Sequence, residues 1–285
     1  MNGVIVIDKP KGKTSHDIVQ KVKRITGEKI GHTGTLDPLA TGVLPILIGT
    51  ATKISKYLVE HDKTYEVVLQ LGEKTISGDA EGEIAETREV PILELKNIQN
   101  VMQKMIGKQK QTPPIYSAIK VKGKKLYEYA RKGETVEIPV REIEIYSINL
   151  QSYLPEEKQI MFTVSCSKGT YIRSFCETIA ETLGTVGYMK ELRRTQVGRF
   201  TLKQALKVEE LEYIESLEEK IFTIETLFEN YPSYILPEKK KDAFYNGVQI
   251  AANQQDGVSR VYEEDGKFIG LGIVKNQKIK RDVLL

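Results

Sequence analysis

The 285-residue sequence predicts an α+β fold in which strand-like and helix-like segments alternate and a small β module follows at the C-terminal end. Three patterns support this prediction: strict alternation of apolar residues at 65–71, helical spacing of apolar residues at 172–183, and a glycine-rich strand pattern at 268–274. Hydrophobic residues make up 40% of the chain and charged residues 28%, which is ordinary for a globular protein. We therefore expect a folded chain with one large and one small domain.

The first residues predict a strand followed by a helix. An apolar run at 4–7 is typical of a buried strand, and Pro10 and Gly12 close it in a turn. Thr14 and Asp17 have the spacing of a helix capping box, and Gly27 marks the end of the helix. The apolar positions of this helix lie on one face: Ile18, Val22 and Ile25.

The middle of the chain predicts two strands and two helices. The alternating segment 65–71 and the run at 160–166 are expected to be strands. Pro91 is expected to open a helix that Gly107 ends, and a second helix is expected at 172–183, before Gly184.

A composition change near Tyr231 and Pro232 predicts a domain boundary. The acidic segment 209–229 is expected to be helical, whereas residues 258–262 and 268–274 are expected to be strands. The division is therefore a main domain at 1–230 and a compact β module at 231–285, packed on the main domain or tethered to it.

Charge and cysteine content narrow the class of protein. The formal net charge of +3 does not by itself indicate a nucleic-acid partner. No apolar run is long enough for a membrane span, and the start does not resemble a signal peptide, so a cytoplasmic protein is expected. Cys166 and Cys176 are expected to be reduced packing thiols, and the three histidines have no metal-site spacing, so we expect no metal.

The segment 120–141 is rich in lysine and arginine, interleaved with Tyr127 and Tyr129. One interpretation is a solvated basic hairpin and short helix. The other is an RNA-binding element, in which the cations neutralise phosphates and the tyrosines offer stacking surfaces. The basic residues of the segment include Lys120, Lys122, Lys124, Lys125, Arg131 and Lys132.

The segment 31–45 is expected to be an irregular loop, because three glycines and two prolines fall within fifteen positions. Function concentrates on such loops. From the residues alone, Asp37 before Pro38 is either a turn-forming aspartate or a reactive carboxylate.

This loop, with its run Gly31-His32-Thr33-Gly34-Thr35-Leu36-Asp37-Pro38, closely resembles the catalytic motif of the TruB family of pseudouridine synthases. Four further segments resemble the family in the same order, across roughly the first 200 residues: 8–15, 63–65, 113–118 and 166–173. The resemblance implies the pseudouridine synthase fold, with a central mixed, mainly antiparallel sheet flanked by helices. It also implies that the C-terminal module is a PUA-like RNA-binding domain, a weaker match that depends on position, length and glycine pattern.

The resemblance implies a cofactor-free reaction that converts the T-loop uridine of tRNA, position 55, to pseudouridine. The uridine must be flipped out of the folded RNA to be reached. Asp37 is then the nucleophile, Tyr65 stacks on the flipped base, and Arg173 keeps Asp37 ionised. Two alternatives without a catalytic role stay open: Tyr65 as an ordinary half-buried tyrosine of a strand, and Arg173 as a surface arginine at a helix N-terminus.

The same resemblance implies a set of RNA-binding residues. His32 and Tyr171 are expected near the flipped base, and Lys9 is expected either to contact phosphate or to support the motif's architecture. The insertion contributes Lys124, Lys125 and Arg131.

The expected partner is the T stem-loop of tRNA, bound by a monomer without a protein partner. Two alternatives remain. One is a guide-RNA-dependent member of the family, a branch that generally lacks the basic insertion. The other is a tRNA-binding or tRNA-folding protein without turnover.

Overall fold

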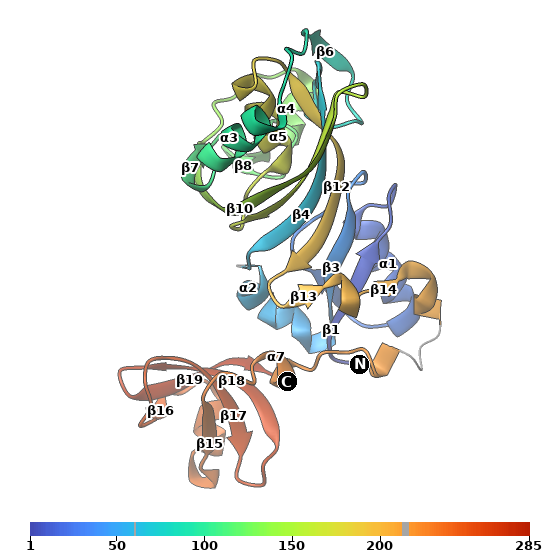
Figure 1. Ribbon diagram of the computed structural model, residues 1–285. Coiled ribbons are helices and arrows are strands. Elements are labelled where there is room, and N and C mark those ends of the chain that lie inside the picture. The colour runs from blue at the N-terminus through green and yellow to red at the C-terminus, as the bar shows by residue number, and fades with distance from the viewer. Residues whose placement is uncertain (60, 213–216) are drawn as a thin grey trace.

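The computed structural model describes residues 1–59, 61–212 and 217–285. One 10-stranded sheet, with the order β14-β1-β3-β12-β4-β11-β10-β7, forms the main body, with β13 paired to β12 and β2 to β3 (Figure 1). β1 pairs in parallel with β14, and β3 with β12, while the other neighbours are antiparallel. This confirms the expected mixed, mainly antiparallel sheet. Its strands are β1 (Gly3–Lys9), β2 (Ile30–His32), β3 (Thr41–Ile48), β4 (Lys63–Leu71), β7 (Gly107–Gln111), β10 (Arg141–Leu154), β11 (Gln159–Cys166), β12 (Gly187–Val197), β13 (Phe200–Thr201) and β14 (Leu206–Lys207).

Helices pack on this sheet as predicted at two places. α1 (Ser15–Thr26) begins with the expected capping box, in which the Thr14 hydroxyl accepts from the Asp17 N–H at 3.0 Å, and ends at left-handed Gly27. α5 (Ile172–Thr182) buries Phe175 and its apolar neighbours against the sheet. Two short helices, η1 (Gly49–Ile54) and α2 (Ser55–Leu58), follow β3. Within the described ranges, no helix is long and apolar enough to cross a membrane.

The helix expected from Pro91 begins later, so that prediction is wrong by one turn. α3 runs over Leu95–Lys104 with Glu94 as an extended N-cap residue. The reason is packing, because Leu93 lies against the core before the helix starts, while Ile92 is fully exposed. Ile98 and Met102 then form the buried face of the helix.

The prediction that all of 31–45 is irregular is also wrong, since strands occupy both ends and only residues 33–40 form the loop. Pro45 lies inside β3, opposite Val6 of β1. In an antiparallel ladder, the nitrogen and carbonyl of one residue point to the same side. The Pro45 carbonyl accepts from Thr33 N–H at 3.2 Å, so its nitrogen faces the end of β2 and its missing N–H leaves the pairing with β1 intact.

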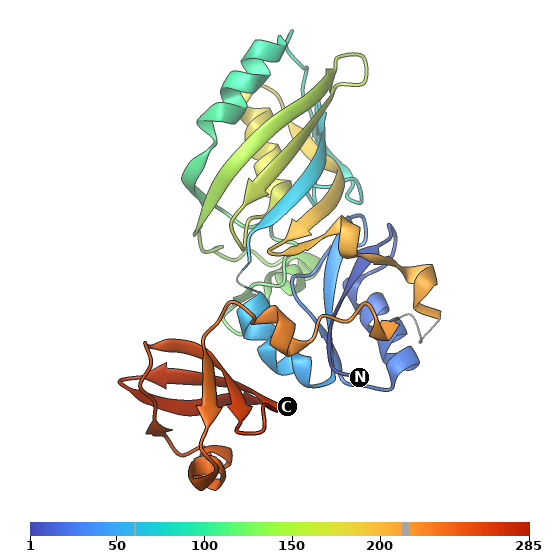
Figure 2. The ribbon, with the colours of Figure 1, turned by 60° about the horizontal axis from the view of Figure 1, so that its bottom comes forward.

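The C-terminal residues form a second, 5-stranded sheet with the order β15-β17-β18-β19-β16 (Figure 2). In the described part of the acidic segment before it, the helical residues are η3 (Val208–Glu212), 217–218 and α7 (Ile224–Leu227), which is less helix than expected; residues 213–216 lie outside the described residues. The elements of this part are β15 (Ser233–Leu236), η4 (Glu238–Lys240), α8 (Lys241–Tyr245), β16 (Ile250–Ala251), β17 (Gly257–Glu263), β18 (Phe268–Lys275) and β19 (Lys278–Leu284).

This second sheet packs directly on the main body. Leu271 and Val283 belong to the same buried cluster as Leu47 and Ile54 of the main body. At the edge of the contact, the Tyr57 hydroxyl and the Lys56 ammonium both donate to the Asp282 carboxylate. Of the two expected arrangements, packed or tethered, the structure shows the packed one.

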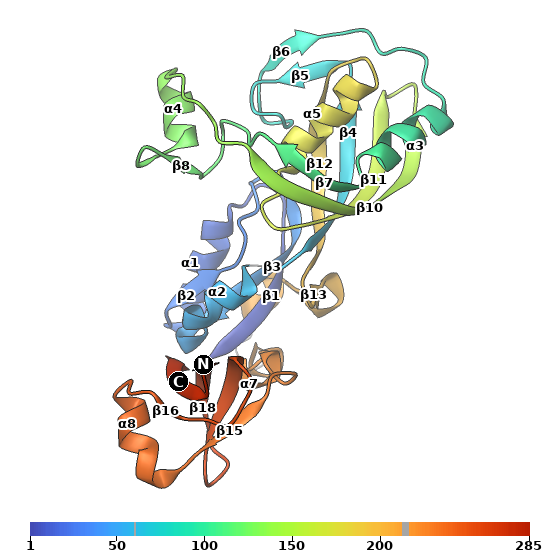
Figure 3. The same cartoon turned by 90° about the vertical axis from the view of Figure 1, so that its left-hand side faces the viewer.

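The basic segment projects from the main body (Figure 3). It consists of a short hairpin, β8 (Lys120–Val121) with β9 (Lys124–Lys125), and the helix α4 (Leu126–Lys132). A second hairpin, β5 (Glu73–Thr75) with β6 (Ile84–Thr87), lies beside the start of α5. The chain therefore places two hairpins near one end of the sheet.

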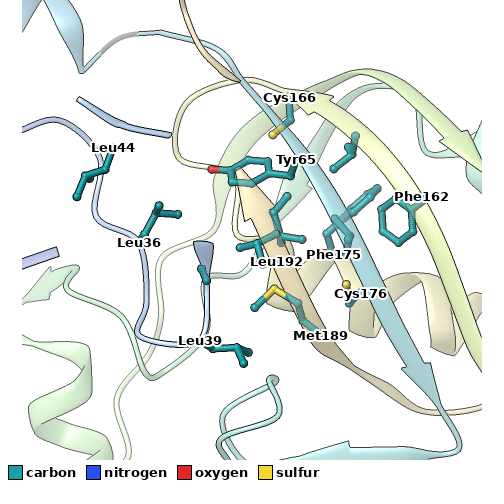
Figure 4. Packing of buried hydrophobic residues seen from close by; sticks show 14 of the residues in the cluster. Leu36, Leu39, Leu44, Tyr65, Phe162, Cys166, Phe175, Cys176, Met189 and Leu192 are labelled. Carbon is teal, nitrogen blue, oxygen red and sulfur yellow. The ribbon is translucent and has the colours of Figure 1, made fainter. Parts of the chain in front are cut away.

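Tyr65 lies in the main hydrophobic core, next to the loop 33–40 (Figure 4). Its ring lies near Cys166 and Leu192, and its hydroxyl points toward the segment that carries Leu36 and Leu44. Cys166 and Cys176 are buried and free, as expected, and burial raises the pKa of the Cys166 thiol to about 11.

Candidate active site

A cavity of about 980 Å³ opens where the loop 33–40 faces β4, β12 and the start of α5. Asp37, Tyr65 and Arg173 all line it, although they lie far apart in the sequence. The segment 116–118 and Tyr127 close another side. The structure thus brings the three expected catalytic residues to one site.

The loop fixes Asp37 by anchoring the residues on either side of it. The Ser15 hydroxyl accepts from Leu36 N–H at 2.9 Å and donates to the Leu36 carbonyl at 3.0 Å. The Pro38 carbonyl accepts from Gly12 N–H at 2.8 Å. Since its neighbours are held, the Asp37 carboxylate has a defined position, yet its side chain remains 40% exposed to the cavity.

Lys9 is a second anchor of the loop. Its side chain is fully buried, and its ammonium donates to the carbonyls of Lys13, Pro38 and Pro10 at 2.5, 3.3 and 3.0 Å. Burial lowers the pKa of Lys9 to about 8. An ammonium whose three donors point at backbone carbonyls favours the architectural role of Lys9 over the phosphate contact.

Arg173 lies in the first turn of α5 and holds Asp37 from across the cavity. Its Nη2 lies 3.1 Å from Asp37 Oδ2 and donates to the Tyr116 carbonyl at 3.0 Å. Its Nη1 donates to the Ser77 carbonyl at 3.2 Å. With the side chain 9% exposed, the surface-arginine alternative is excluded. A cation at a helix N-terminus is disfavoured by the helix dipole unless an anion lies there, and Asp37 supplies one.

Asp79 is a second anion at this guanidinium and was not anticipated from the sequence. Its Oδ2 lies 3.6 Å from Arg173 Nη1, and its side chain is 5% exposed. Ser77 Oγ and Glu81 N–H donate to Asp79 Oδ1 at 2.6 and 3.1 Å. Asp79 lies within a run of turn-forming residues and resembles any aspartate that caps its own turn, so no pattern in the sequence marks it as functional.

Tyr65 is buried in β4, opposite Arg194 of the neighbouring strand β12. Burial raises the pKa of Tyr65 to about 12, while the Arg194 guanidinium acts in the opposite direction. The tyrosine is therefore neutral at pH 7 and presents an aromatic wall to the cavity.

Arg194 of β12 was also missed. Its guanidinium is 1% exposed, and it donates from Nε to the Val43 carbonyl at 2.8 Å and from Nη2 to the Gly34 carbonyl at 2.9 Å. These carbonyls lie on the two sides of the Asp37 loop. Gly42 permits this close approach, because a Cβ there would lie 2.1 Å from the Arg194 carbonyl oxygen.

Of the two residues expected to contact the RNA near the flipped base, Tyr171 lines the cavity and His32 does not. Tyr171 lines the cavity as the N-cap residue of α5, held through its backbone N–H to Gln111 Oε1 at 2.8 Å. His32 is half-buried in β2, and its Nδ1 has no hydrogen-bond partner within the described residues. Burial and the nearby Arg194 charge lower the pKa of His32, which makes the ring neutral at pH 7.

Lys124, Lys125 and Arg131 lie on the projecting insertion and do not line the cavity. Lys125 and Arg131 both lie over the Tyr127 ring, at 5.3 and 5.4 Å from its centroid. The expectation that Tyr129 offers a stacking surface is wrong, because it is 8% exposed and its hydroxyl donates to the Val121 carbonyl. Its ring belongs to the small core of the insertion.

Family models match almost the whole chain. Residues 22–172 match the TruB family pseudouridylate synthase N-terminal domain, residues 173–230 the tRNA pseudouridylate synthase B C-terminal domain, and residues 232–285 the C-terminal domain of pseudouridine synthase II TruB. A solved structure described as "Crystal Structure of a Cbf5-Nop10-Gar1 Complex" is similar at a TM-score of 0.71 and 26% identity, over 95% of this chain and 78% of that one.

Curated relatives agree with these matches. A tRNA pseudouridine synthase B of Caldanaerobacter subterraneus subsp. tengcongensis is 40% identical over 283 residues, covering 98% of both chains. Another, of Francisella tularensis subsp. novicida, is 41% identical over 297 residues, covering 100% of this chain and 97% of the relative. The chain therefore belongs to the TruB family of pseudouridylate synthases.

Proposed function

We propose that this chain isomerises the T-loop uridine of tRNA, position 55, to pseudouridine, with Asp37 as the catalytic carboxylate. The observation that carries the proposal is the 3.1 Å ion pair of Asp37 with Arg173 on the wall of a cavity that Tyr65 also lines. The curated relatives, named tRNA pseudouridine synthase B, support tRNA as the substrate.

The geometry supports a sequence of three tasks. A flipped uridine enters the cavity, and the Tyr65 ring stacks on the base to offset part of the unstacking cost. Arg173 orients the Asp37 carboxylate through their ion pair, so that the carboxylate can attack C1′ of the ribose, attack C6 of the base or assist a glycal route. The uracil then turns and bonds to C1′ through C5, and C5 loses its proton.

The RNA would be held outside the cavity by the insertion 120–141, through Lys124, Lys125 and Arg131. Residues 1–230 form the catalytic domain in this proposal, and 231–285 form a PUA-like module for the acceptor side of the tRNA. His32 and Tyr171 would contact the nucleotides next to the flipped base. The enzyme would act in the cytoplasm as a monomer without guide RNA, and the basic insertion supports this over the guide-dependent alternative.

The test is release of tritium from tRNA carrying 5-tritiated uridine, with mapping of the modified position. We expect release at the T-loop uridine by the wild-type protein and none by Asp37→Asn. Bound tRNA without release from the wild type would reject the proposal in favour of a binding or folding function. Release only after a guide RNA is added would favour the guide-dependent alternative.

A further inference from the structure

Three arginines line the cavity, Arg141, Arg173 and Arg194, and Arg194 is the most deeply buried of them. Arg173 pairs with Asp37 and Asp79, whereas no ion pair within 4.0 Å is found for Arg194 in the part of the chain that the structure describes. Arg194 instead donates to two backbone carbonyls, and it lies directly opposite Tyr65 where β12 pairs with β4. A charge removed from water in this way is costly unless another charge offsets it.

The positive charge of Arg194 also affects the pKa values of several neighbouring groups. Its charge lowers the pKa values of Lys9, Lys63 and His32, although burial is the larger cause for each of them. It also acts to lower the pKa of Tyr65, against the larger effect of burial. Arg194 therefore places a positive charge on the wall of the cavity, and its two hydrogen-bond acceptors there are neutral carbonyls.

The proposed reaction supplies such an anion. When the bond from C1′ to N1 breaks, its electron pair remains on the uracil and spreads over N1 and the two carbonyl oxygens. On the direct route, Asp37 forms an ester bond to C1′ and loses its charge; on the glycal route, it takes a proton from C2′. If Asp37 attacks C6 instead, the charge moves to the O4 enolate. In each case one negative charge moves from Asp37 to the base.

This transfer separates the charge from its original partner. Arg173 stabilises the carboxylate before the reaction and loses that interaction as the charge leaves Asp37. A second cation near the base is then needed to keep the charge-separated state low in free energy. Arg194 lies beside Tyr65, the residue proposed to stack on the base.

We propose that Arg194 is a positioning residue for this reaction, which acts through the Tyr65 hydroxyl to stabilise the negative charge on the displaced uracil. This inference rests on the proposed function. The guanidinium orients the hydroxyl with its oxygen toward Arg194 and its hydrogen free for the base.

A purely structural role makes a different prediction. Arg194 bridges the Gly34 and Val43 carbonyls, so it could serve only to tie the two sides of the Asp37 loop together. Lysine keeps the charge but loses the planar fork, whereas glutamine keeps hydrogen-bond donors but loses the charge. An electrostatic role therefore ranks Arg194→Lys above Arg194→Gln in activity, and a tether ranks glutamine equal or higher.

The experiment measures single-turnover tritium release and tRNA affinity for Arg194→Lys, Arg194→Gln and the control Arg193→Gln. Arg193 is the adjacent arginine, exposed in part and paired with Asp8 at 2.7 Å. We expect Arg194→Gln to lose at least about 100-fold in rate. Affinity should stay within about threefold of wild type. Arg194→Lys should retain more activity, and Arg193→Gln should match wild type.

A double-mutant cycle with Tyr65→Phe tests the route through the hydroxyl. If Arg194 acts through Tyr65, adding Arg194→Gln to Tyr65→Phe should cost much less than it does alone. Equal rates for the lysine and glutamine variants, or additive losses in the cycle, would overturn the inference. If the glutamine variant does not fold, the same cycle with Arg194→Lys decides. An inactive wild type would instead reject the proposed function itself.

Discussion

Arg173 interacts with two carboxylates from one position in the first turn of α5. Its Nη2 lies nearer to Asp37, at 3.1 Å, than its Nη1 does to Asp79, at 3.6 Å. The less exposed carboxylate, Asp79, is held by its own turn, so it fixes the guanidinium. The more exposed one, Asp37, is left to react. One arginine can thus be both anchored and available to the reacting group.

Arg173→Ala should therefore lose turnover far more than tRNA affinity. Without the guanidinium, the Asp37 carboxylate loses the cation 3.1 Å away that orients it, and a loss of at least about 100-fold in turnover is expected. Single-turnover kinetics and filter binding separate the two effects, with Arg193→Gln as the matched control. A comparable loss in the binding constant would count against this role.

Because Lys9 is buried, the free energy of unfolding should depend measurably on pH. Burial lowers the pKa of Lys9 to about 8 in the folded state, whereas an exposed lysine has a pKa of 10.5. Below pH 8 both states are protonated, and the full cost of burying the charge is present. Between pH 8 and 10.5 the unfolded state binds more protons, so stability rises with pH.

The comparison for this prediction is Lys9→Met, which lacks the titrating group. From pH 8 to 10.5 the unfolding free energy of wild type should rise relative to Lys9→Met by up to about 3 kcal/mol. Urea unfolding at several pH values measures the difference. A difference that stays flat with pH would show that Lys9 titrates normally.

At the scale of residues, motif resemblance located Asp37, Tyr65 and Arg173, but it did not locate the groups that support them. Asp79 lies in a turn whose composition resembles that of many other turns. Arg194 follows another arginine on a strand and could have been suspected, because period two puts it on the same face as buried Leu192. Its burial depends on contacts with Gly34 and Val43, which lie more than 150 positions away.

At the scale of elements, the insertion is a unit with its own small core. Leu126, Tyr129 and Ile119 are buried, and Leu126 N–H donates to the Ile119 carbonyl at 2.8 Å. Tyr127 N–H donates to the Ser117 carbonyl at 3.1 Å, which ties the insertion to the cavity wall. Because the apolar residues face inward, the lysines and Arg131 are left on its surface.

Replacing Lys124, Lys125 and Arg131 together with alanine should weaken tRNA binding and flatten its salt dependence. Each phosphate contact that is lost should reduce the slope of log affinity against log salt by about 1. The control replaces three exposed lysines outside the insertion: Lys96, Lys104 and Lys158. An unchanged slope in the insertion variant would remove this element from the RNA interface.

Periodicity predicted the helices α1, α3 and α5 and the strands β1, β4, β11, β17 and β18, because each buries one face on a sheet. Most of the other strands were not predicted. Periodicity gave the wrong start for α3, since Pro91 is a helix-start signal that the packing of Leu93 overrides. The order of the strands could not be predicted from local pattern. β12 lies between β3 and β4 in the sheet, although it follows β4 by more than 100 residues in the sequence.

At the scale of the whole molecule, the two sheets share a core. Leu271 of β18 packs in the cluster that includes Leu47 and Ile54 of the main body, while Ile269 on the same strand packs inside the C-terminal module. Positions two apart share a face on a regular strand, but the pairing of β18 with β17 shifts register between Val261–Gly270 and Tyr262–Phe268, which lets Ile269 and Leu271 pack in different cores. This arrangement predicts that the module and the main body unfold together.

Leu271→Ala should break that coupling. Loss of a fully buried leucine costs about 2–5 kcal/mol, and here the cavity opens in the shared core, so one calorimetric transition should become two. Ile269→Ala is the control, because it weakens the module's own core and should lower the stability of the whole chain while keeping a single transition. If Leu271→Ala still melts in one transition, the sheets are coupled by the polar contacts of Asp282 with Tyr57 and Lys56, and Asp282→Asn should then separate them.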